Sequence, residues 1–282
     1  MQSNNAVSSH IMSPITDAEL EQLLIDILDV YGYDFTEYAQ ASLRRRIVRL
    51  FSLDRYQSFS EFRHRIKSDS SYFRRFIEEV TVNVTEMFRH PAFFRTLRLE
   101  VLPILSTYPF IRIWHAGCAT GEEAYSMAIL LKEANLLHKS VIYATDISPA
   151  AIKRASSGLV PMQYMRQYAQ NYLDAGGLVD FSDYYTAGNN KALIRHDLRK
   201  NIVFSTHNLV AETSFNQFQL ICCRNVLIYF DKSLQRRVFD LFDSSLERLG
   251  FLALGAKESM RTANCYGNYK AIGMEKIWRK ME

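Results

Sequence analysis

One segment in the middle of the chain, Gly117-Cys-Ala-Thr-Gly-Glu-Glu-Ala-Tyr-Ser126, has residue types suited to binding a cofactor. Its glycines let the backbone turn tightly and let a ligand approach closely. A dinucleotide site would need G-x-G-x-x-G, with helix N–H groups on a pyrophosphate, and that spacing is absent. Glu122 and Glu123 would repel a pyrophosphate but suit a ligand that carries an ammonium and a sulfonium. Acidic residues also stabilise a helix N-terminus, so the loop alone leaves both interpretations open.

A second candidate is Asp146, which ends the next expected strand. A carboxylate in this place could accept hydrogen bonds from both hydroxyls of a ribose. The alternative is that Asp146 caps the following helix. Pro149 begins that helix better with Ser148 as its cap, and we therefore favour the ribose.

A third candidate lies in Cys223-Arg-Asn-Val-Leu-Ile-Tyr-Phe-Asp231, after a further expected strand. Asn225 and Tyr229 are polar in places where apolar residues would cost less to bury. Polar loop residues at strand ends are often functional, although a satisfied structural turn is the alternative. Ligands of open α/β sheets bind outside the carboxyl ends of the strands, so we expect the three candidates to meet at one site.

The elements that position these residues follow from hydrophobic patterning. From about residue 111, apolar runs alternate with helical stretches, which predicts a mostly parallel sheet covered by helices. The expected strands are 111–114, 141–144, 202–204, 218–222, 251–254 and 276–278. The expected helices are 125–131, 149–155 and 232–249.

The first third of the chain predicts helices only. Thr16 is a plausible N-cap before apolar residues at helical spacing over 20–28. Further amphipathic helices are expected at 37–53, 59–66 and 73–80. Their aromatic residues indicate a hydrophobic core.

The stretch 161–200 breaks the alternation of strands and helices, because it is polar and rich in tyrosine. Residues 184–186 and 192–194 could pair as a hairpin across Gly188-Asn-Asn190. We therefore expect a small insertion on the sheet.

Composition limits the class of protein. A net charge of +4 is too small to indicate nucleic-acid binding by itself. The four cysteines form no C-x-x-C pair and no histidine cluster has metal-ligand spacing, so we predict no metal. The start of the chain lacks a signal-peptide pattern, and no apolar run is long enough to span a membrane. We expect residues 1–15 to be a loose extension of a cytoplasmic protein.

Five motifs follow one another in the chain. They are Asn83-Val-Thr-Glu-Met-Phe-Arg89, Gly117 to Ser126, Ala144-Thr-Asp-Ile147, Asn208-Leu209, and Cys223 to Asp231. In this order, after a helical N-terminal region, they resemble the CheR family, the chemotaxis receptor glutamate methyltransferases. The resemblance implies an α/β fold with a helical domain (16–80), a linker (81–97) and a Rossmann-like methyltransferase domain (98–282). A small antiparallel β-subdomain (160–200) is inserted in that last domain.

The resemblance also implies S-adenosylmethionine as the cofactor, with S-adenosylhomocysteine as the product. The cofactor-binding residues that it implies are Asn83, Thr85, Arg89, Gly117, Glu123, Asp146, Asn208, Leu209, Asn225 and Val226. Glu123 and Asp146 would hold the methionine and ribose ends, and Asn208-Leu209 would frame the adenine. Arg89 and Tyr229 are the implied catalytic residues that face the transferred methyl.

The implied reaction forms a methyl ester on glutamates in the cytoplasmic methylation helices of chemoreceptors. Such a carboxylate is ionised at neutral pH, because its unperturbed pKa is about 4.3. No general base is needed, and positioning should carry catalysis. We expect Arg89 to orient the acceptor carboxylate and Tyr229 to line the path of the methyl group.

Arg45, Arg46 and Arg49 project away from the apolar stripe of their helix and could dock an acidic receptor helix. The alternative is a solvated surface. The short Ala187-Gly-Asn-Asn190 loop suggests that no C-terminal receptor pentapeptide is bound. Rival functions are methylation of another substrate, cofactor binding without turnover, and nicotinamide-dependent dehydrogenation, which the missing G-x-G-x-x-G disfavours.

Overall fold

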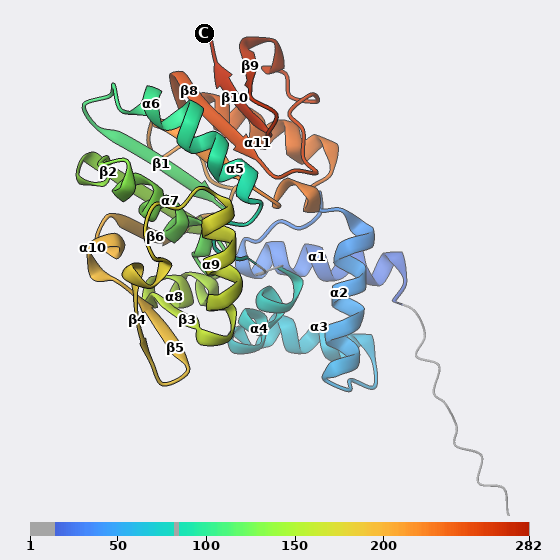
Figure 1. The fold of residues 1–282 in the computed structure, drawn as a ribbon. Coiled ribbons are helices and arrows are strands. Elements are labelled where there is room, and N and C mark those ends of the chain that lie inside the picture. Colours follow the sequence, from blue (N-terminus) through green and yellow to red (C-terminus); the bar gives the residue numbers. More distant parts are fainter. Residues whose placement is uncertain (1–14, 82–84, 282) are drawn as a thin grey trace, which may run out of the picture.

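The structure is a computed structural model that describes residues 15–81 and 85–281. Its first part is all helical (Figure 1), with α1 (Asp17–Tyr31), α2 (Gln40–Leu53), α3 (Phe59–Ser68) and α4 (Ser70–Val80). Thr16 caps α1 as predicted, in a capping box with Glu19. The apolar faces of the four helices enclose one core, in which Phe62 and Phe76 are fully buried.

Three short helical segments, which the sequence did not predict, lead into the sheet. They are α5 (Pro91–Thr96), a π-helical stretch (Leu97–Val101) and α6 (Leu102–Leu105). Pro91 starts α5 at a position where its missing N–H costs nothing. Phe93, Phe94 and Leu97 are then buried against the sheet, so tertiary packing stabilises helices too short to stand alone.

The large sheet has seven strands in the order β6-β2-β1-β7-β8-β10-β9. They are β1 (Ile111–Ala116), β2 (Ser140–Asp146), β6 (Ile202–Thr206), β7 (Phe218–Cys223), β8 (Leu246–Leu254), β9 (Tyr269–Ile272) and β10 (Ile277–Lys280). The first five strands in this order pair in parallel, and β10 and β9 are antiparallel. The α/β fold class is therefore confirmed, and all six expected strands are present.

Chain order reverses between β1 and β7. The chain leaves β1 towards β2 and β6 and later returns on the other side of β1 with β7 and β8. Helices α7 (Glu122–Glu133), α8 (Pro149–Ser157) and α11 (Lys232–Ser245) make the connections. A reversal of this kind leaves a crevice at the carboxyl ends of the strands, where ligands of open α/β sheets bind.

The two faces of the sheet bury different cores. Ile111 and Ile113 of β1 pack with α5, α6 and α7. Trp114 and Ala116 point the other way and pack with α11. This alternation is the period of two that a buried strand requires.

The predicted helix 232–249 is wrong at its end. Helix α11 stops at Ser245, and Leu246 already pairs with Phe218 in the sheet. The register shifts between Phe218 and Leu220, and Leu249 has a φ of 65°, so the strand starts with an irregularity. Strand β9 was also missed in the sequence.

The insertion holds β3 (Leu159–Pro161), α9 (Met165–Asp174), β4 (Tyr185–Gly188), β5 (Lys191–Ile194) and α10 (His196–Arg199). The predicted hairpin is confirmed: β4 and β5 pair across Asn189 and Asn190, which both have positive φ. Helix α9 was not predicted. Further 3₁₀ turns are Leu137–Lys139, Met162–Tyr164, Phe181–Tyr184, Leu227–Tyr229 and Tyr266–Asn268.

The insertion is fixed to the end of α7 by one buried carboxylate, Glu133. It accepts hydrogen bonds from the hydroxyls of Tyr172 and Tyr184 and from the amide of Leu178. Arg98 pairs with its other oxygen at 2.6 Å. The helix that begins at the candidate cofactor loop thus ends on the insertion.

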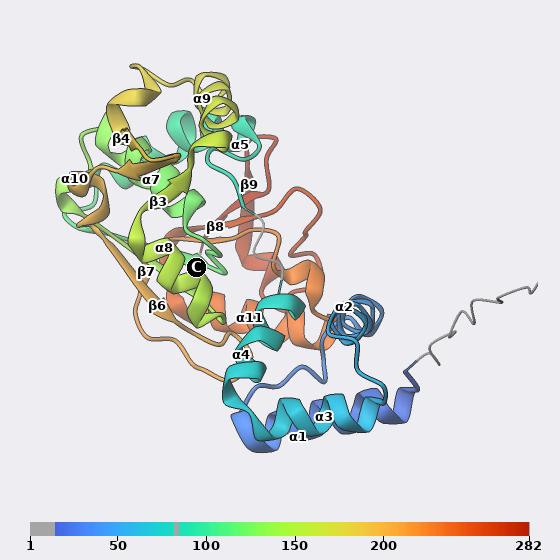
Figure 2. The same cartoon turned by 90° about the horizontal axis from the view of Figure 1, so that it is seen from below.

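The helical part joins the sheet through the segment before α2. The amide of Ala39 donates to the Tyr229 carbonyl (2.8 Å), and that of Asp231 donates to the Glu37 carbonyl (2.9 Å). Glu37 also pairs with Arg237 of α11. Figure 2 shows α2 beside α11. These contacts therefore fix the position of α2 relative to the loop that carries Tyr229.

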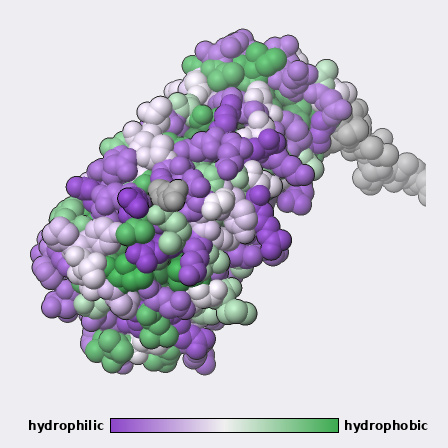
Figure 3. All heavy atoms as spheres, turned by 90° about the horizontal axis from the view of Figure 1, so that it is seen from above, coloured by the Kyte–Doolittle hydropathy of each residue, from purple (hydrophilic) through white to green (hydrophobic). Residues whose placement is uncertain are grey.

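The surface is mixed in character. Figure 3 shows a largely hydrophilic face with hydrophobic residues in separate groups. Among the helices that the structure describes, none is both long and apolar enough to cross a membrane.

Candidate functional site

A single pocket collects most of the predicted residues at the carboxyl ends of β1, β2 and β7. It contains about 1120 Å³ of space, part of it open solvent. Its lining includes Thr85, Arg89, Gly117, Glu123, Asp146, Asn208, Leu209, Asn225, Val226 and Tyr229. Asn83 lies outside the described residues.

Steric constraints at two positions determine the conformation of the glycine loop, Gly117 to Gly121. Gly117 has a φ of 79°, and a Cβ atom there would lie 2.3 Å from the Val226 Cγ2 atom. Gly121 has a φ of 92°, and its Cβ would lie 2.9 Å from the Ala155 Cβ atom. Both positions therefore require glycine. The amide of Gly117 donates to the Thr145 carbonyl (2.8 Å), which draws the loop towards the end of β2.

Asp146 is buried and organises two loops. One carboxylate oxygen accepts from the Ala119 amide (2.8 Å), and the other accepts from the Ser148 amide (2.9 Å). Ser148 is the cap of α8, as predicted, because its hydroxyl accepts from the Ala151 amide. Burial raises the pKa of Asp146, although the amide hydrogen bonds oppose this. The carboxylate also lines the pocket, so it can accept a further hydrogen bond from a ligand there.

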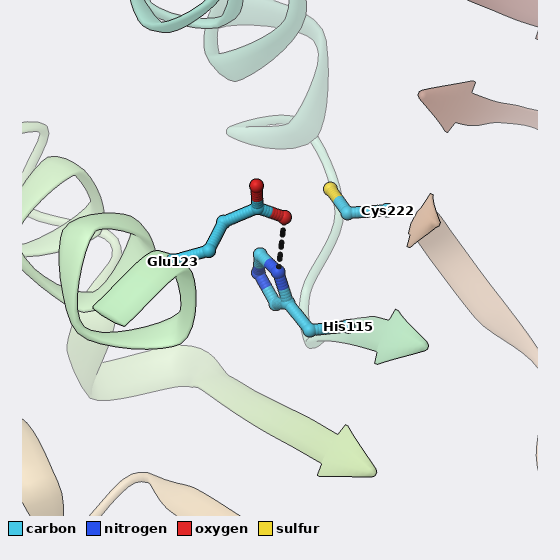
Figure 4. Close-up of side chains that lie close together, drawn as sticks. All are labelled: His115, Glu123 and Cys222. Atoms are coloured by element: carbon cyan, nitrogen blue, oxygen red, sulfur yellow. Dashed lines mark hydrogen bonds and ion pairs between the residues drawn. The ribbon is translucent and has the colours of Figure 1, made fainter. Parts of the chain in front are cut away.

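The carboxylate of Glu123 is held from two sides. His115 Nδ1 lies 3.0 Å from Oε1 (Figure 4), and the Arg224 guanidinium donates to Oε2 at 2.6 Å. Burial alone would raise the pKa of Glu123, but Arg224 and His115 outweigh it and bring this pKa to about 2. Glu123 is thus a fixed anion on the pocket wall.

Glu122 differs from its neighbour. Its carboxylate accepts from the Thr120 hydroxyl (2.7 Å), and burial raises its pKa. Glu122 does not line the pocket. The two adjacent carboxylates that the sequence offers as a pair therefore have separate surroundings, and only Glu123 faces the ligand space.

Cys222 completes a group with His115 and Glu123 (Figure 4), whose candidate ligand atoms all lie within 4.8 Å of one another. The spacing in the sequence did not predict this group. Arg224 already compensates the charge of Glu123, and burial raises the pKa of the Cys222 thiol well above its usual value. We therefore interpret the group as an ion-pair network rather than a metal centre.

Two residues that the sequence reasoning missed hold the loop after β7. Arg224 is buried between Glu123 and α5. Glu258 accepts hydrogen bonds from the amides of Gly255 (2.6 Å), Asn225 (2.9 Å) and Ile228 (3.3 Å). Asn225 has a φ of 63°, a conformation that these bonds help to hold. Arg224 stood inside the recognised motif, whereas no local signal marks Glu258.

The pocket also contains unused polar atoms. His115 Nε2 and His207 Nδ1 are buried without a hydrogen-bond partner among the described residues, and both side chains line the pocket. Buried polar atoms nearly always have partners. These two nitrogens therefore fit a polar ligand, as does the anionic Glu123 beside His115.

The three predicted substrate-binding arginines separate in the structure. Arg45 and Arg49 are exposed on α2, whereas Arg46 lines the pocket. The Arg46 guanidinium lies 5.7 Å from the centre of the Tyr229 ring, and its buried Nε has no partner among the described residues. Arg46 therefore faces the pocket and the other two arginines face solvent, and the substrate-binding role of all three stays a prediction. Burial raises the pKa of Tyr229, so its hydroxyl stays protonated at neutral pH.

Comparisons with known proteins show what the chain is similar to. The profile of the CheR methyltransferase SAM-binding domain matches residues 83–275, and that of the CheR all-alpha domain matches residues 18–81. Cher3 of Pseudomonas putida is 46% identical, with 87% of this chain and 90% of the relative covered. A chemotaxis protein methyltransferase of Listeria innocua is 32% identical, with 84% and 88% covered. One from Borreliella burgdorferi is 29% identical, with 88% and 90% covered.

Proposed function

Since the chain belongs to the CheR methyltransferase family, we propose that it methylates glutamate side chains of chemoreceptors and forms glutamyl methyl esters there. The enzyme is an S-adenosylmethionine-dependent methyltransferase. The observation that best supports the proposed acceptor is Arg46: a half-buried, cationic side chain beside Tyr229 in the cofactor pocket suits an incoming carboxylate.

The residues of the pocket fit the cofactor, which supplies a methyl group on a sulfonium. In our proposal Glu123 binds the ammonium of its methionine end, because this carboxylate is fixed and ionised. Asp146 receives the ribose hydroxyls, and Asn208-Leu209 frames the adenine. Asn225-Val226 and the Gly117 turn close on the methionine side, where Val226 packs over the glycine. Thr85 and Asn83 would contribute from the linker.

Positioning carries the chemistry in this proposal. The acceptor carboxylate is already ionised at neutral pH, so no residue has to remove a proton. Arg46 and Arg89 orient it, and Tyr229 lines the path of the methyl group. Tyr38 and Phe230 pack together at the junction beside this point and help to exclude water.

Recognition of the receptor is assigned to the exposed face of α2. Arg45 and Arg49 lie outside the pocket on the same helix that carries Arg46. An acidic methylation helix that docks on them would have its glutamate delivered towards Arg46. We further propose that the enzyme works in the cytoplasm, binds no nucleic acid, and uses no C-terminal pentapeptide, since Gly188 to Asn190 is a tight turn. Calorimetric titration with the free pentapeptide tests the last point, and heat of binding would contradict it.

The test is incubation with methyl-labelled S-adenosylmethionine and receptor fragments. Base-labile label on the fragment indicates a carboxyl ester, as proposed. Label that resists base would point to another nucleophile and so to methylation of a different kind of acceptor. Fragments whose methylated glutamates are replaced by glutamine serve as the control, and they should stay unlabelled.

A further inference from the structure

Arg224 connects three segments that carry cofactor-site residues. Its side chain is 2% exposed. One terminal nitrogen donates to Glu123 of α7 (2.6 Å), and the other donates to the carbonyl of Arg89 in the linker (3.2 Å). Arg224 itself precedes Asn225, the next residue on the pocket wall.

The guanidinium is fixed on its remaining side by aromatic rings. It lies 3.9 Å from the centre of the Phe93 ring and 5.9 Å from that of Phe94, both in α5. Such stacking suits the flat guanidinium group. The side chain therefore has a single geometry, defined by a carboxylate, a carbonyl and an aromatic floor.

This geometry matters for Glu123 in particular. A glutamate has a flexible side chain, and burial disfavours its charged form. His115 and Arg224 each take one of its oxygens, so the carboxylate is both ionised and oriented. Without Arg224 the carboxylate would lose its nearest cation and one of its two anchors.

We propose that Arg224 is a positioning residue, which presents the Glu123 carboxylate to the cofactor ammonium and holds the Arg89 segment against the pocket. The inference rests on the proposed role of Glu123. A lysine could replace the charge but not the two-sided contact, because an ammonium lacks the planar fork. Arg224→Lys should therefore keep cofactor affinity better than it keeps turnover, since the hydrogen bond to the Arg89 carbonyl is lost.

The ligand pair for the test is S-adenosylhomocysteine and an analogue that lacks its amino group. Calorimetry gives both dissociation constants for the wild type, Arg224→Met, Arg224→Lys and Glu123→Gln. In the wild type the amino group should improve affinity by roughly 10- to 100-fold, as a hydrogen bond between charged groups does. In Arg224→Met and in Glu123→Gln this preference should fall below about 3-fold.

Arg98→Met is the matched control. Arg98 also pairs with a buried glutamate, Glu133, at 2.6 Å, but it lies outside the pocket. This variant should lower thermal stability and leave the preference for the amino group unchanged. A purely structural role of Arg224 would give the same result in Arg224→Met.

The outcomes separate the two proposals. Equal affinity of the wild type for both ligands, or a full preference in Glu123→Gln, would overturn the role of Glu123 and this inference with it. If Glu123→Gln loses the preference for the amino group but Arg224→Met keeps it, the inference about Arg224 is overturned, while the proposed role of Glu123 stands. If Arg224→Met does not fold, Arg224→Lys tests the inference in its place. This variant should retain the preference for the amino group. Its kcat for the methylation of receptor fragments should fall by about 10-fold or more. An unchanged kcat in Arg224→Lys would overturn the proposal that Arg224 holds the Arg89 segment against the pocket.

Discussion

Tyr229 shows how far a single residue could be assigned from the sequence. Its motif predicted a polar group beside the reacting centre, and the structure has the ring in the pocket. Its neighbour in the structure, Arg46, is one of three arginines predicted to bind the substrate, and the sequence did not distinguish it from Arg45 and Arg49. The periodicity of a helix shows which residues lie outside its apolar face. Which of these residues then faces a pocket depends on how the helix packs against another domain.

Replacing Tyr229 by phenylalanine should lower kcat more than it lowers cofactor affinity. The ring still fills its place beside Arg46, whereas the hydroxyl next to the path of the methyl group is lost. We expect a fall in kcat of roughly 10-fold, the upper range for one hydrogen bond. Steady-state kinetics with receptor fragments and calorimetry with S-adenosylhomocysteine measure the two effects. Unchanged turnover would refute the assigned role.

Glu123 should contribute a pH-dependent part of the stability. Its folded pKa of about 2 lies below the ordinary value of 4.5, so its ionised form stabilises the fold above about pH 4.5. That contribution is lost as the pH falls from about 4.5 towards 2. Glu123→Gln should be less stable than the wild type at pH 7, by on the order of a few kcal/mol, and this gap should narrow below pH 4.5.

Urea unfolding at several pH values measures this gap. The exposed Glu21, replaced by glutamine, is the control and should show no such narrowing. A gap between the wild type and Glu123→Gln that stays constant from pH 7 to pH 3 would contradict the ion-pair network.

At the scale of elements, the glycine loop from Gly117 to Gly121 depends on its close approach to the loop that carries Val226. Gly117→Ala places a methyl group 2.3 Å from Val226 Cγ2 at a positive φ, so the Val226 side chain or one of the two loops must shift. We expect a loss of at least about 10-fold in cofactor affinity and a destabilisation of about 1–3 kcal/mol. Gly188→Ala is the control, because a Cβ there meets nothing within 4 Å. Equal effects of both substitutions would show that the contact with Val226 is unimportant.

The exposed face of α2 should act through charge. Arg45→Glu and Arg49→Glu together should weaken receptor methylation through KM by at least about 10-fold and leave cofactor affinity intact, since both side chains lie outside the pocket. Added salt should likewise weaken receptor binding but not cofactor binding. Arg74→Glu, on the exposed face of α4, is the matched control. Similar losses in this variant would argue for general electrostatic attraction instead of a docking face.

The elements that could be predicted are those with a clear period. Helix 232–249 was extended too far because Leu246 and Leu249 continue the helical spacing, and pairing with Phe218 overrides it. Helix α9 was missed because its buried face is made of tyrosines, Tyr168 and Tyr172, in a polar stretch. In both segments, contacts with residues far apart in the sequence determine the secondary structure. A single sequence does not show which residues make those contacts.

At the scale of the whole molecule, two cores meet at Tyr38. Its ring lies 4.9 Å from the centre of the Phe35 ring in the helical part and 5.0 Å from that of Phe230, the residue after Tyr229. Backbone hydrogen bonds at Glu37 and Ala39 flank it. This short segment therefore couples the helix that should bind the receptor to the loop that holds Tyr229.

Tyr38→Ala should uncouple the unfolding of the two parts. Both tryptophans, Trp114 and Trp278, lie in the large sheet, so fluorescence reports on that part while circular dichroism at the helix band reports on both. Loss of two aromatic contacts and their buried area should cost about 2 kcal/mol or more. In the wild type the two signals should give one midpoint, whereas in Tyr38→Ala the helical signal should change first. Tyr164→Ala, an exposed ring on the insertion, should leave them coincident. Coincident transitions in Tyr38→Ala would mean that the remaining hydrogen bonds and ion pairs suffice to join the two parts.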